Sequence, residues 1–194
     1  MLYLVRHGRT DANARGLLQG RLDPSLDDVG RAQARAIAGM IGEVDEVIAS
    51  PLVRARETAE HFGRQVTLDA RWLELAYGVL EGTPASEVAG EVWQQWRDDP
   101  DFATPGGESF GSLNSRVREA CGELIGRIGE RRVVVVSHVS PIKAAVAWAL
   151  NAPLDIMFHC HLAQASVCQV SIGKFGPILH SFNEQAGPID GSGR

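Results

Sequence analysis

The chain opens on Leu2-Tyr3-Leu4-Val5-Arg6-His7-Gly8, in which four apolar residues are followed by an arginine, a histidine and a glycine. The apolar run predicts a short strand that would bring Arg6 and His7 to its carboxyl end, the edge at which open α/β sheets bind ligands. Arginine is a fixed cation suited to bidentate recognition of phosphate, and histidine can act as a nucleophile or a base. A permanent cation beside His7 would repel a metal ion. The pattern therefore indicates phosphoryl chemistry on histidine.

Two further strands are predicted to end in residues of the same kind. Residues 46–49 lead into Ser50-Pro51, and a helix with proline in its first turn would then carry Arg54. Residues 132–136 contain four consecutive valines, which is typical of a strand buried on both faces, and Ser137-His138 follows them. Three strand ends would thus bring two histidines and at least two arginines to one crevice.

The remaining periodicity completes an α/β pattern. The other predicted segments are a helix at 27–42, a short strand at 66–68, a helix at 109–129, a helix at 141–150 and strands at 164–172 and 177–182. Such alternation implies a largely parallel sheet with helices on both faces. We expect residues 1–186 to form one domain and residues 187–194 to form a disordered tail.

Composition argues against several other classes of protein. The 194 residues suffice for one ordinary domain, and a formal net charge of -5 without any basic run argues against a nucleic-acid binder. No segment approaches the roughly 20 apolar residues of a membrane span. The strand-like start leaves no room for a signal peptide, so we expect a cytoplasmic protein. Cys121, Cys160 and Cys168 are odd in number and form no CxxC pair, which favours free thiols in a reducing compartment.

An ordered set of motifs runs along almost the whole chain. Its members are Leu4-Val5-Arg6-His7-Gly8-Arg9-Thr10, Asn13, Gln19-Gly20, Ser50-Pro51-Leu52 with Arg54, Glu74 with Gly78 and Glu81-Gly82, Pro105-Gly106-Gly107-Glu108-Ser109, and Val136-Ser137-His138. The set resembles the phosphatase branch of the histidine phosphatase superfamily, also called the phosphoglycerate mutase-like family, over residues 2–182. The resemblance implies a three-layer α/β/α sandwich and a phosphatase that needs neither metal nor cofactor.

The resemblance also implies roles for individual residues. His7 would take up the phosphoryl group covalently on one ring nitrogen, while a backbone carbonyl holds the other. Arg6, Arg54 and His138 would surround the phosphoryl oxygens, where charge is concentrated in the transition state. The implied substrate-binding set is Arg6, Asn13, Gln19, Gly20, Arg54, His138 and Val139, the last through backbone N–H groups at a helix start.

Glu74 would protonate the leaving alcohol and then accept a proton from the attacking water. Glu81 is the runner-up for that role and otherwise a structural carboxylate at the rim of the pocket. The spacing Leu73-Glu74-Leu75-Ala76-Tyr77-Gly78 is what aligns Glu74 with the acid of the family.

Three functional alternatives follow from these residues. The first is a phosphatase acting on a small phosphorylated metabolite. The second is a mutase, which would return the phosphoryl group to another hydroxyl. The third is a catalytically silent protein that binds a phosphorylated ligand, which is disfavoured because His7 and Glu74 are both present.

Other features leave the substrate open. His138-Val139-Ser140-Pro141 resembles the phosphatase half of actinobacterial fusions with ribonuclease H, some of which are linked to α-ribazole phosphate. A sugar phosphate or a phosphoglycerate fits the motifs equally well. His159 and His161 could share the face of a strand and bind a metal, but no third ligand is evident. Residues 83–104 would shape the substrate pocket if they overhang it, and the oligomeric state is open, with a homodimer as one arrangement.

Overall fold

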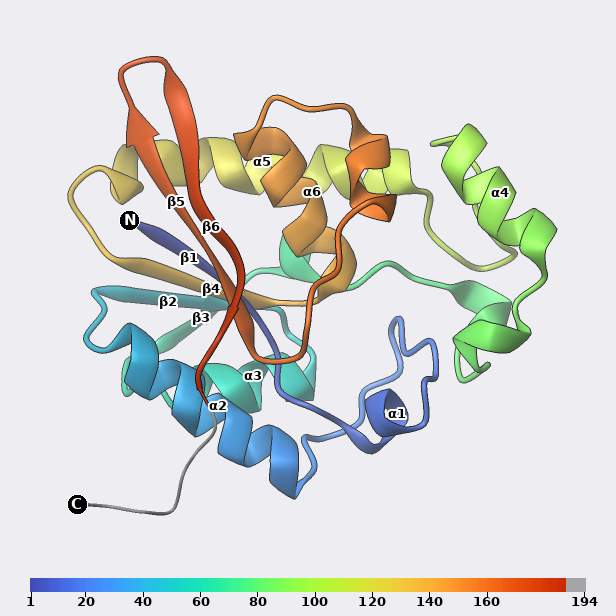
Figure 1. Cartoon of the computed structure of the whole chain (residues 1–194), viewed down its shortest axis with the longest axis horizontal. Coiled ribbons are helices and arrows are strands. Elements are labelled where there is room, and N and C mark those ends of the chain that lie inside the picture. Colours follow the sequence, from blue (N-terminus) through green and yellow to red (C-terminus); the bar gives the residue numbers. More distant parts are fainter. Residues whose placement is uncertain (188–194) are drawn as a thin grey trace.

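A sheet of six strands forms the centre of the molecule (Figure 1), and the computed structural model describes residues 1–187. The strands are β1 (Leu2–Arg6), β2 (Glu46–Ala49), β3 (Val66–Leu68), β4 (Val133–Ser137), β5 (Ser166–Gly173) and β6 (Gly176–Gln185). Their order in the sheet is β3-β2-β4-β1-β5-β6. The first four pair in parallel, whereas β5 is antiparallel to both of its neighbours. The predicted α/β fold with a mostly parallel sheet is confirmed.

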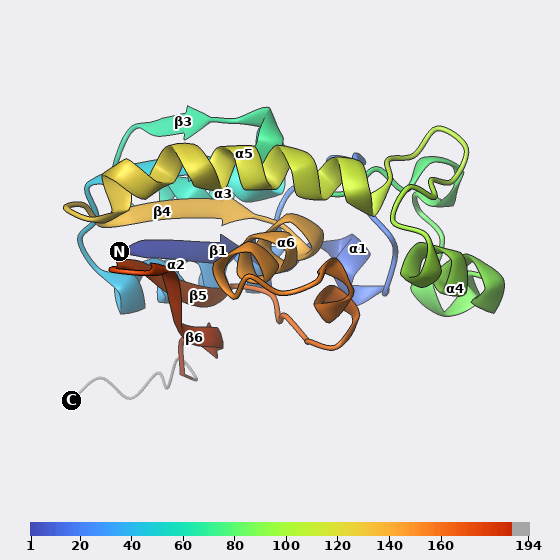
Figure 2. The same cartoon turned by 90° about the horizontal axis from the view of Figure 1, so that it is seen from above.

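Helices cover both faces of this sheet. They are α1 (Asp11–Ala14), α2 (Asp28–Ile41), α3 (Val53–Glu60), α4 (Gly90–Asp98), α5 (Phe110–Ile128) and α6 (Val139–Ala149). Figure 1 shows α5 and α6 above the sheet and α2 and α3 below it. In Figure 2 the arrows of β1 and β4 point toward α1, so α1 lies beyond the carboxyl ends of the strands.

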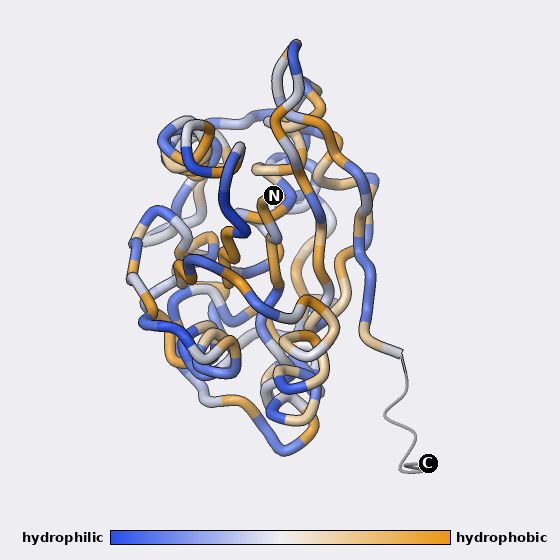
Figure 3. Tube along the Cα trace, turned by 90° about the vertical axis from the view of Figure 1, so that its left-hand side faces the viewer, coloured by the Kyte–Doolittle hydropathy of each residue, from blue (hydrophilic) through white to orange (hydrophobic). Residues whose placement is uncertain are grey.

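Alternation along the strands divides the apolar core into two layers. Leu2 and Leu4 of β1 pack with residues of α5 and α6, whereas Tyr3 and Val5 pack with residues of α2 and α3. The valines of β4 alternate in the same way, and all four are fully buried. Figure 3 shows hydrophobic segments along the inner strands and hydrophilic ones along the outer turns. Burying each such side chain contributes roughly 1.5–3 kcal/mol, so the two layers fix the strands that carry Arg6 and His138.

The starts of helices α3 and α6 differ from the sequence prediction, and helix α4 lies in a stretch expected to be irregular. The Asp27 side chain caps α2 by accepting a hydrogen bond from Gly30 N at 2.7 Å, as predicted. By contrast, α3 begins at Val53, not in the first turn after Ser50. The amide of Val53 donates to the side chain of Asp23 at 2.6 Å, so the residue that satisfies this helix end is distant in sequence. Helix α6 begins at Val139, two residues before Pro141. Proline is tolerated there because amides in the first turn of a helix donate no hydrogen bond within the helix.

The proposed strand around His159 and His161 does not exist. Both residues are exposed in a loop that follows a 3₁₀ turn at Leu154–Phe158, so strand alternation cannot place them on one face. Among residues 1–187 no group of three or more His, Cys, Asp or Glu side chains could hold a metal ion. In the same range no helix is long and apolar enough to cross a membrane. The predicted disordered tail lies outside the described residues, apart from Gly187.

Candidate active site

The carboxyl ends of three neighbouring strands meet at one edge of the sheet. Strands β2, β4 and β1 are adjacent, and backbone hydrogen bonds continue the pairing past their ends. His7 N donates to Ser137 O at 3.0 Å, and Ser50 N donates to Val136 O at 2.9 Å. The segments that carry the two histidines and Arg54 are therefore fixed side by side. Although charged or polar, the catalytic residues predicted here are all buried: Arg6, His7, Arg54, Glu74 and His138.

His7 is held in one tautomer. Its Nδ1 lies 2.7 Å from the carbonyl oxygen of Gly8, which confirms the prediction that a backbone carbonyl holds one ring nitrogen. Because a carbonyl can only accept, Nδ1 carries the hydrogen and Nε2 keeps its lone pair. Arg54 Nε donates to that Nε2 at 3.3 Å. Burial, followed by the charges of Arg54 and Arg6, lowers the pKa of His7 well below its usual value, so the ring is neutral at neutral pH.

The two arginines are oriented by backbone carbonyl groups. Arg54 donates from Nη1 to Leu22 O at 2.6 Å and from Nη2 to Gly20 O at 2.9 Å. Arg6 donates from Nη1 to Leu162 O, while its buried Nε has no partner in the part of the chain that the structure describes. Burial lowers the pKa of Arg6 to about 10, which still leaves it cationic at neutral pH. The site therefore presents fixed positive charge and at least one unsatisfied donor.

His138 lies beside His7. The two ring centroids are 5.0 Å apart, and His138 Nε2 is 2.8 Å from the hydroxyl oxygen of Ser50. No atom of residues 1–187 partners the buried Nδ1 of His138. Burial and then Arg54 lower the pKa of His138 well below its usual value. A buried ring nitrogen without a hydrogen-bond partner costs free energy of folding. Such an unsatisfied nitrogen is expected in a group that binds a ligand.

Glu74 reaches the first turn of α6. Its carboxylate accepts hydrogen bonds from the amides of Leu75 at 2.8 Å, Val139 at 3.1 Å and Ser140 at 3.2 Å. A carboxylate is favoured at a helix N-terminus by the unpaired N–H groups and the helix dipole. We expected the Val139 amide to face a bound phosphoryl group, but in this state it donates to Glu74.

These residues surround a cavity of about 220 Å³. Its walls are formed by Arg6, His7, Asn13, Leu17, Leu18, Gln19, Gly20, Arg54, Glu74, Tyr77 and Val139. Every residue of the predicted substrate-binding set is among them except His138, whose ring centroid lies 5.0 Å from that of His7. The side-chain oxygen of Asn13 accepts from the Thr10 amide at 3.1 Å, and that of Gln19 accepts from the Thr10 hydroxyl at 3.1 Å, which leaves both NH₂ groups as donors.

The sequence did not assign a role to Leu17, Leu18 or Tyr77, although all three line the cavity. Burial, followed by the charge of Glu74, raises the pKa of Tyr77, so its phenol stays protonated and can donate a hydrogen bond. Its ring packs edge-on against Trp96, with centroids 5.8 Å apart. Residues 83–104 thus support the pocket through Trp96 without lining it. The position of Tyr77, three residues after the expected acid, was the available signal.

Glu81 has a structural environment. Its Oε1 accepts hydrogen bonds from the amides of Arg21 at 2.9 Å and Tyr77 at 3.2 Å. It is not among the residues that line the cavity. Glu81 therefore ties the loop at Gly20 to the segment that carries Glu74, as expected for a carboxylate behind the rim.

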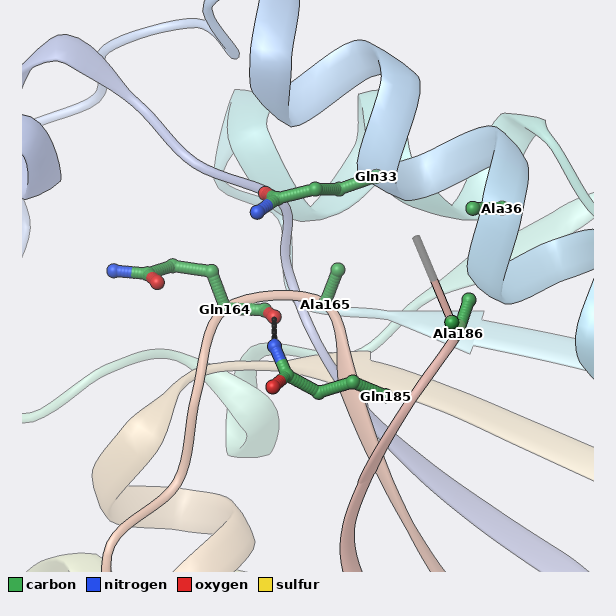
Figure 4. Close-up of a pocket in the computed structure, with 7 residues that line it drawn as sticks. Gln33, Ala36, Gln164, Ala165, Gln185 and Ala186 are labelled. Carbon is green, nitrogen blue, oxygen red and sulfur yellow. Dashed lines mark hydrogen bonds between the residues drawn. The ribbon is translucent and has the colours of Figure 1, made fainter. Parts of the chain in front are cut away.

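A second pocket lies between α2 and the ends of β5 and β6 (Figure 4). The side chains of Gln33, Gln164 and Gln185 surround it, and Gln185 Nε2 donates to Gln164 O at 3.3 Å. Its described lining contains amides, alanines and a glycine but no titratable group. The described lining of this second pocket therefore offers no acid, base or cation for phosphoryl transfer.

Comparison with known proteins agrees with this geometry. The model of the histidine phosphatase superfamily (branch 1) matches residues 2–185, and the chain belongs to that family. It is 36% identical to a bifunctional protein of Mycobacterium tuberculosis, over 90% of this chain but only 50% of that protein. The chain thus spans about half the length of the first relatives it matches.

Two further similarities cover more than three quarters of both chains. The glucosyl-3-phosphoglycerate phosphatase of Mycolicibacterium vanbaalenii is 35% identical, over 79% of this chain and 76% of that one. A phosphoserine phosphatase mutant of Entamoeba histolytica, solved in complex with phosphoserine, superposes with a TM-score of 0.87 at 27% identity. That match covers 94% of this chain and 96% of the other. These relatives are phosphatases of small phosphomonoesters.

Proposed function

We propose that this chain is a phosphoric monoester hydrolase that acts on a small phosphorylated metabolite through a phosphohistidine at His7. Family membership and the phosphatase relatives support the class of reaction. The geometry of His7 supports the mechanism most directly. Its Nε2 carries no hydrogen because Nδ1 donates to the carbonyl of Gly8, and the buried Arg54 donates to that Nε2 at 3.3 Å.

In the first step, Nε2 of His7 attacks the phosphorus atom and the bond to the ester oxygen breaks. Glu74, protonated at that moment, gives its proton to the departing oxygen, so that a neutral alcohol leaves. Arg6, Arg54 and the Nδ1 of His138 would donate to the three phosphoryl oxygens as their charge increases. These donors are already oriented in the resting site, so little reorganisation is needed.

In the second step, a water molecule attacks the phosphorus atom of phosphohistidine. The Glu74 carboxylate accepts a proton from that water, the nitrogen–phosphorus bond breaks, and phosphate leaves. His7 returns to its neutral form and Glu74 to its protonated form. Asn13, Gln19 and Tyr77 would donate hydrogen bonds to the phosphoryl group or to the alcohol.

The proposal predicts that the purified chain releases phosphate from a panel of phosphorylated sugars, glycerates, amino acids and nucleosides. A quench that avoids low pH should trap phosphate on His7, because the phosphoramidate bond hydrolyses in acid. His7→Ala should abolish both the adduct and turnover, by more than about 10³-fold, since no other histidine of the described residues lines the cavity.

His61→Ala is the matched control, because His61 is exposed and does not line the cavity. Activity should also survive a chelator, since arginine side chains supply the positive charge that a metal would otherwise give. A His7→Ala variant that keeps turning over would refute the covalent mechanism. A wild-type chain that hydrolyses no phosphomonoester would refute the reaction itself.

We also infer a cytoplasmic location. The support is the chemistry of the cysteines, since Cys121, Cys160 and Cys168 are all free thiols. Free thiols persist in reducing compartments.

A further inference from the structure

Glu74 lies in a segment without regular secondary structure. Residues 73–77 connect a 3₁₀ turn at Ala70–Trp72 to another at Gly78–Leu80, so neither a helix nor a sheet ladder holds the backbone there. Even so, Glu74 is only 6% exposed, and a shift of its backbone would displace its carboxyl group within the cavity. Some other contact must therefore fix this backbone.

The carbonyl groups of this segment and of the 3₁₀ turn before it accept hydrogen bonds from other parts of the fold. Three of these bonds join Ser137 Oγ to Trp72 O at 2.6 Å, Glu108 N to Ala76 O at 2.8 Å, and Thr104 Oγ1 to Tyr77 O at 2.7 Å. Arg116 of α5 holds two more. It donates from Nη1 to Arg71 O and from Nη2 to Glu74 O at 3.3 Å.

Arg116 is itself held by a carboxylate. Its Nε donates to Glu108 Oε1 at 2.7 Å, and its Nη2 donates to Glu108 Oε2 at 2.9 Å. Arg21, which follows Gly20 of the cavity wall, donates to the same Oε2 at 3.2 Å. Burial acts to raise the pKa of Glu108, but its hydrogen bonds and charge interactions with Arg116, and the charge of Arg21, hold it below the usual value. Glu108 therefore stays ionised and keeps the guanidinium of Arg116 in one orientation.

We propose that Arg116 is a positioning residue for Glu74, which it holds through the backbone while Glu108 holds Arg116. The inference rests on the proposed role of Glu74 as acid and base. Arg116 does not line the cavity, so it can affect the reaction only through the segment it binds. A displacement of about 1 Å in a catalytic group can cost 10²-fold in rate.

Lysine should not replace this arginine. The planar guanidinium spans two carboxylate oxygens and two carbonyl oxygens at once, whereas an ammonium group is a single point on a flexible stem. Arg116→Lys therefore keeps the charge opposite Glu108 but loses the geometry. Arg118→Lys is the matched control, since Arg118 lies on the same helix and is exposed.

The kinetic test compares an alkyl phosphate, whose leaving group needs a proton, with p-nitrophenyl phosphate, whose leaving group does not. Arg116→Lys should lower kcat on the alkyl ester by about 30-fold or more and on the aryl ester by less than about 3-fold. KM for both should change little, and Glu108→Gln should show the same pattern more weakly. Equal losses on the two esters, or unchanged kcat on the alkyl ester, would overturn the inference.

A second measurement does not depend on turnover. The amides of Leu75, Val139 and Ser140 donate to the Glu74 carboxylate, so their hydrogen exchange reports whether Glu74 is in place. Arg116→Lys should speed this exchange by about tenfold while the amides of β4 keep their protection. Unchanged exchange would contradict the inference even if the chain proved to have no phosphatase activity, and absent turnover with faster exchange would refute only the proposed function.

Discussion

The surroundings of individual residues in this site determine their protonation states. Burial and the nearby arginines lower the pKa of His7 and His138 well below the usual histidine value. A neutral imidazole is what a nucleophile needs, because a protonated ring has no lone pair to attack phosphorus. The same burial makes protonation of these histidines unfavourable in the folded state. The free energy of unfolding should therefore depend on pH.

We expect the free energy of unfolding to fall as the pH drops below about 6.5. In that range the unfolded chain binds protons at both histidines while the folded chain does not, so protonation favours unfolding. The urea midpoint should therefore decrease from pH 7.5 to pH 5.5, a window above the usual carboxyl range near 4. His138→Asn should reduce this slope, whereas His61→Asn, at an exposed position, should preserve it. A midpoint that is constant over the window would show that the histidines titrate normally.

The proposed role of Glu74 as acid makes a separate prediction. Glu74→Gln should slow hydrolysis of alkyl phosphates by about 10²-fold or more, because an amide cannot protonate the leaving oxygen. Aryl phosphates should be affected less, since their leaving groups need little protonation. Glu81→Gln is the comparison, because Glu81 holds backbone amides and does not line the cavity. If Glu81→Gln showed the leaving-group pattern and Glu74→Gln did not, the two assignments would be exchanged.

At the level of elements, the loop after β1 is held against α2 by two glycines. A Cβ atom on Gly8 would lie 2.3 Å from Gly30 O, and one on Gly30 would lie 1.9 Å from Arg9 O. Both contacts are with backbone, which cannot move aside as a side chain could. The loop that carries His7 is thus positioned by direct contact with the first turn of α2.

Gly30→Ala should therefore destabilise the fold by roughly 1–3 kcal/mol, as overpacking usually does, and lower turnover by displacing the loop at His7. Gly39→Ala is the control within the same helix, because a Cβ there meets nothing within 4 Å. That control should raise the unfolding free energy by about 0.5–1 kcal/mol, the usual gain of alanine over glycine inside a helix. Urea denaturation and phosphate release measure both effects. Similar behaviour of the two variants would show that the contact at Gly30 is not tight.

The elements also show which parts of this structure a sequence can predict. The ends of β1, β2 and β4 follow from local apolar runs and from the geometry of parallel sheets, so the convergence of His7, Arg54 and His138 was predictable. The placement of Glu74 was not derivable in this way. Its segment has no periodicity and is held by side chains of α5 and the 104–108 loop, so only resemblance to a family could assign it. The predicted start of α3 was wrong for a similar reason. The first amide of this helix donates to Asp23, which is distant in sequence.

At the scale of the whole molecule, the parts of the chain that line the cavity help to distinguish a phosphatase from a mutase. Its residues come from 6–20, Arg54, 74–77 and Val139. None comes from 83–104, and none from the described end of the chain after β6. The segment 83–104 instead packs Trp96 behind Tyr77. We therefore expect that neither segment, as far as it is described, closes over a bound substrate.

A mutase must keep its phosphoenzyme intact while the intermediate turns over in the site, and this requires that water be kept away. A cavity whose walls lack a covering segment admits water, so phosphorylated His7 should hydrolyse faster than it returns its phosphoryl group to an alcohol. We therefore expect phosphate release without a bisphosphate primer. The test supplies 3-phosphoglycerate with catalytic 2,3-bisphosphoglycerate and follows isomerisation and phosphate release together, with His7→Ala as the blank. Isomerisation outrunning hydrolysis by about tenfold, a difference of about 1.4 kcal/mol between the two barriers, would identify a mutase. Phosphate release from other monoesters with negligible isomerisation would identify a phosphatase whose open cavity commits each phosphoenzyme to water.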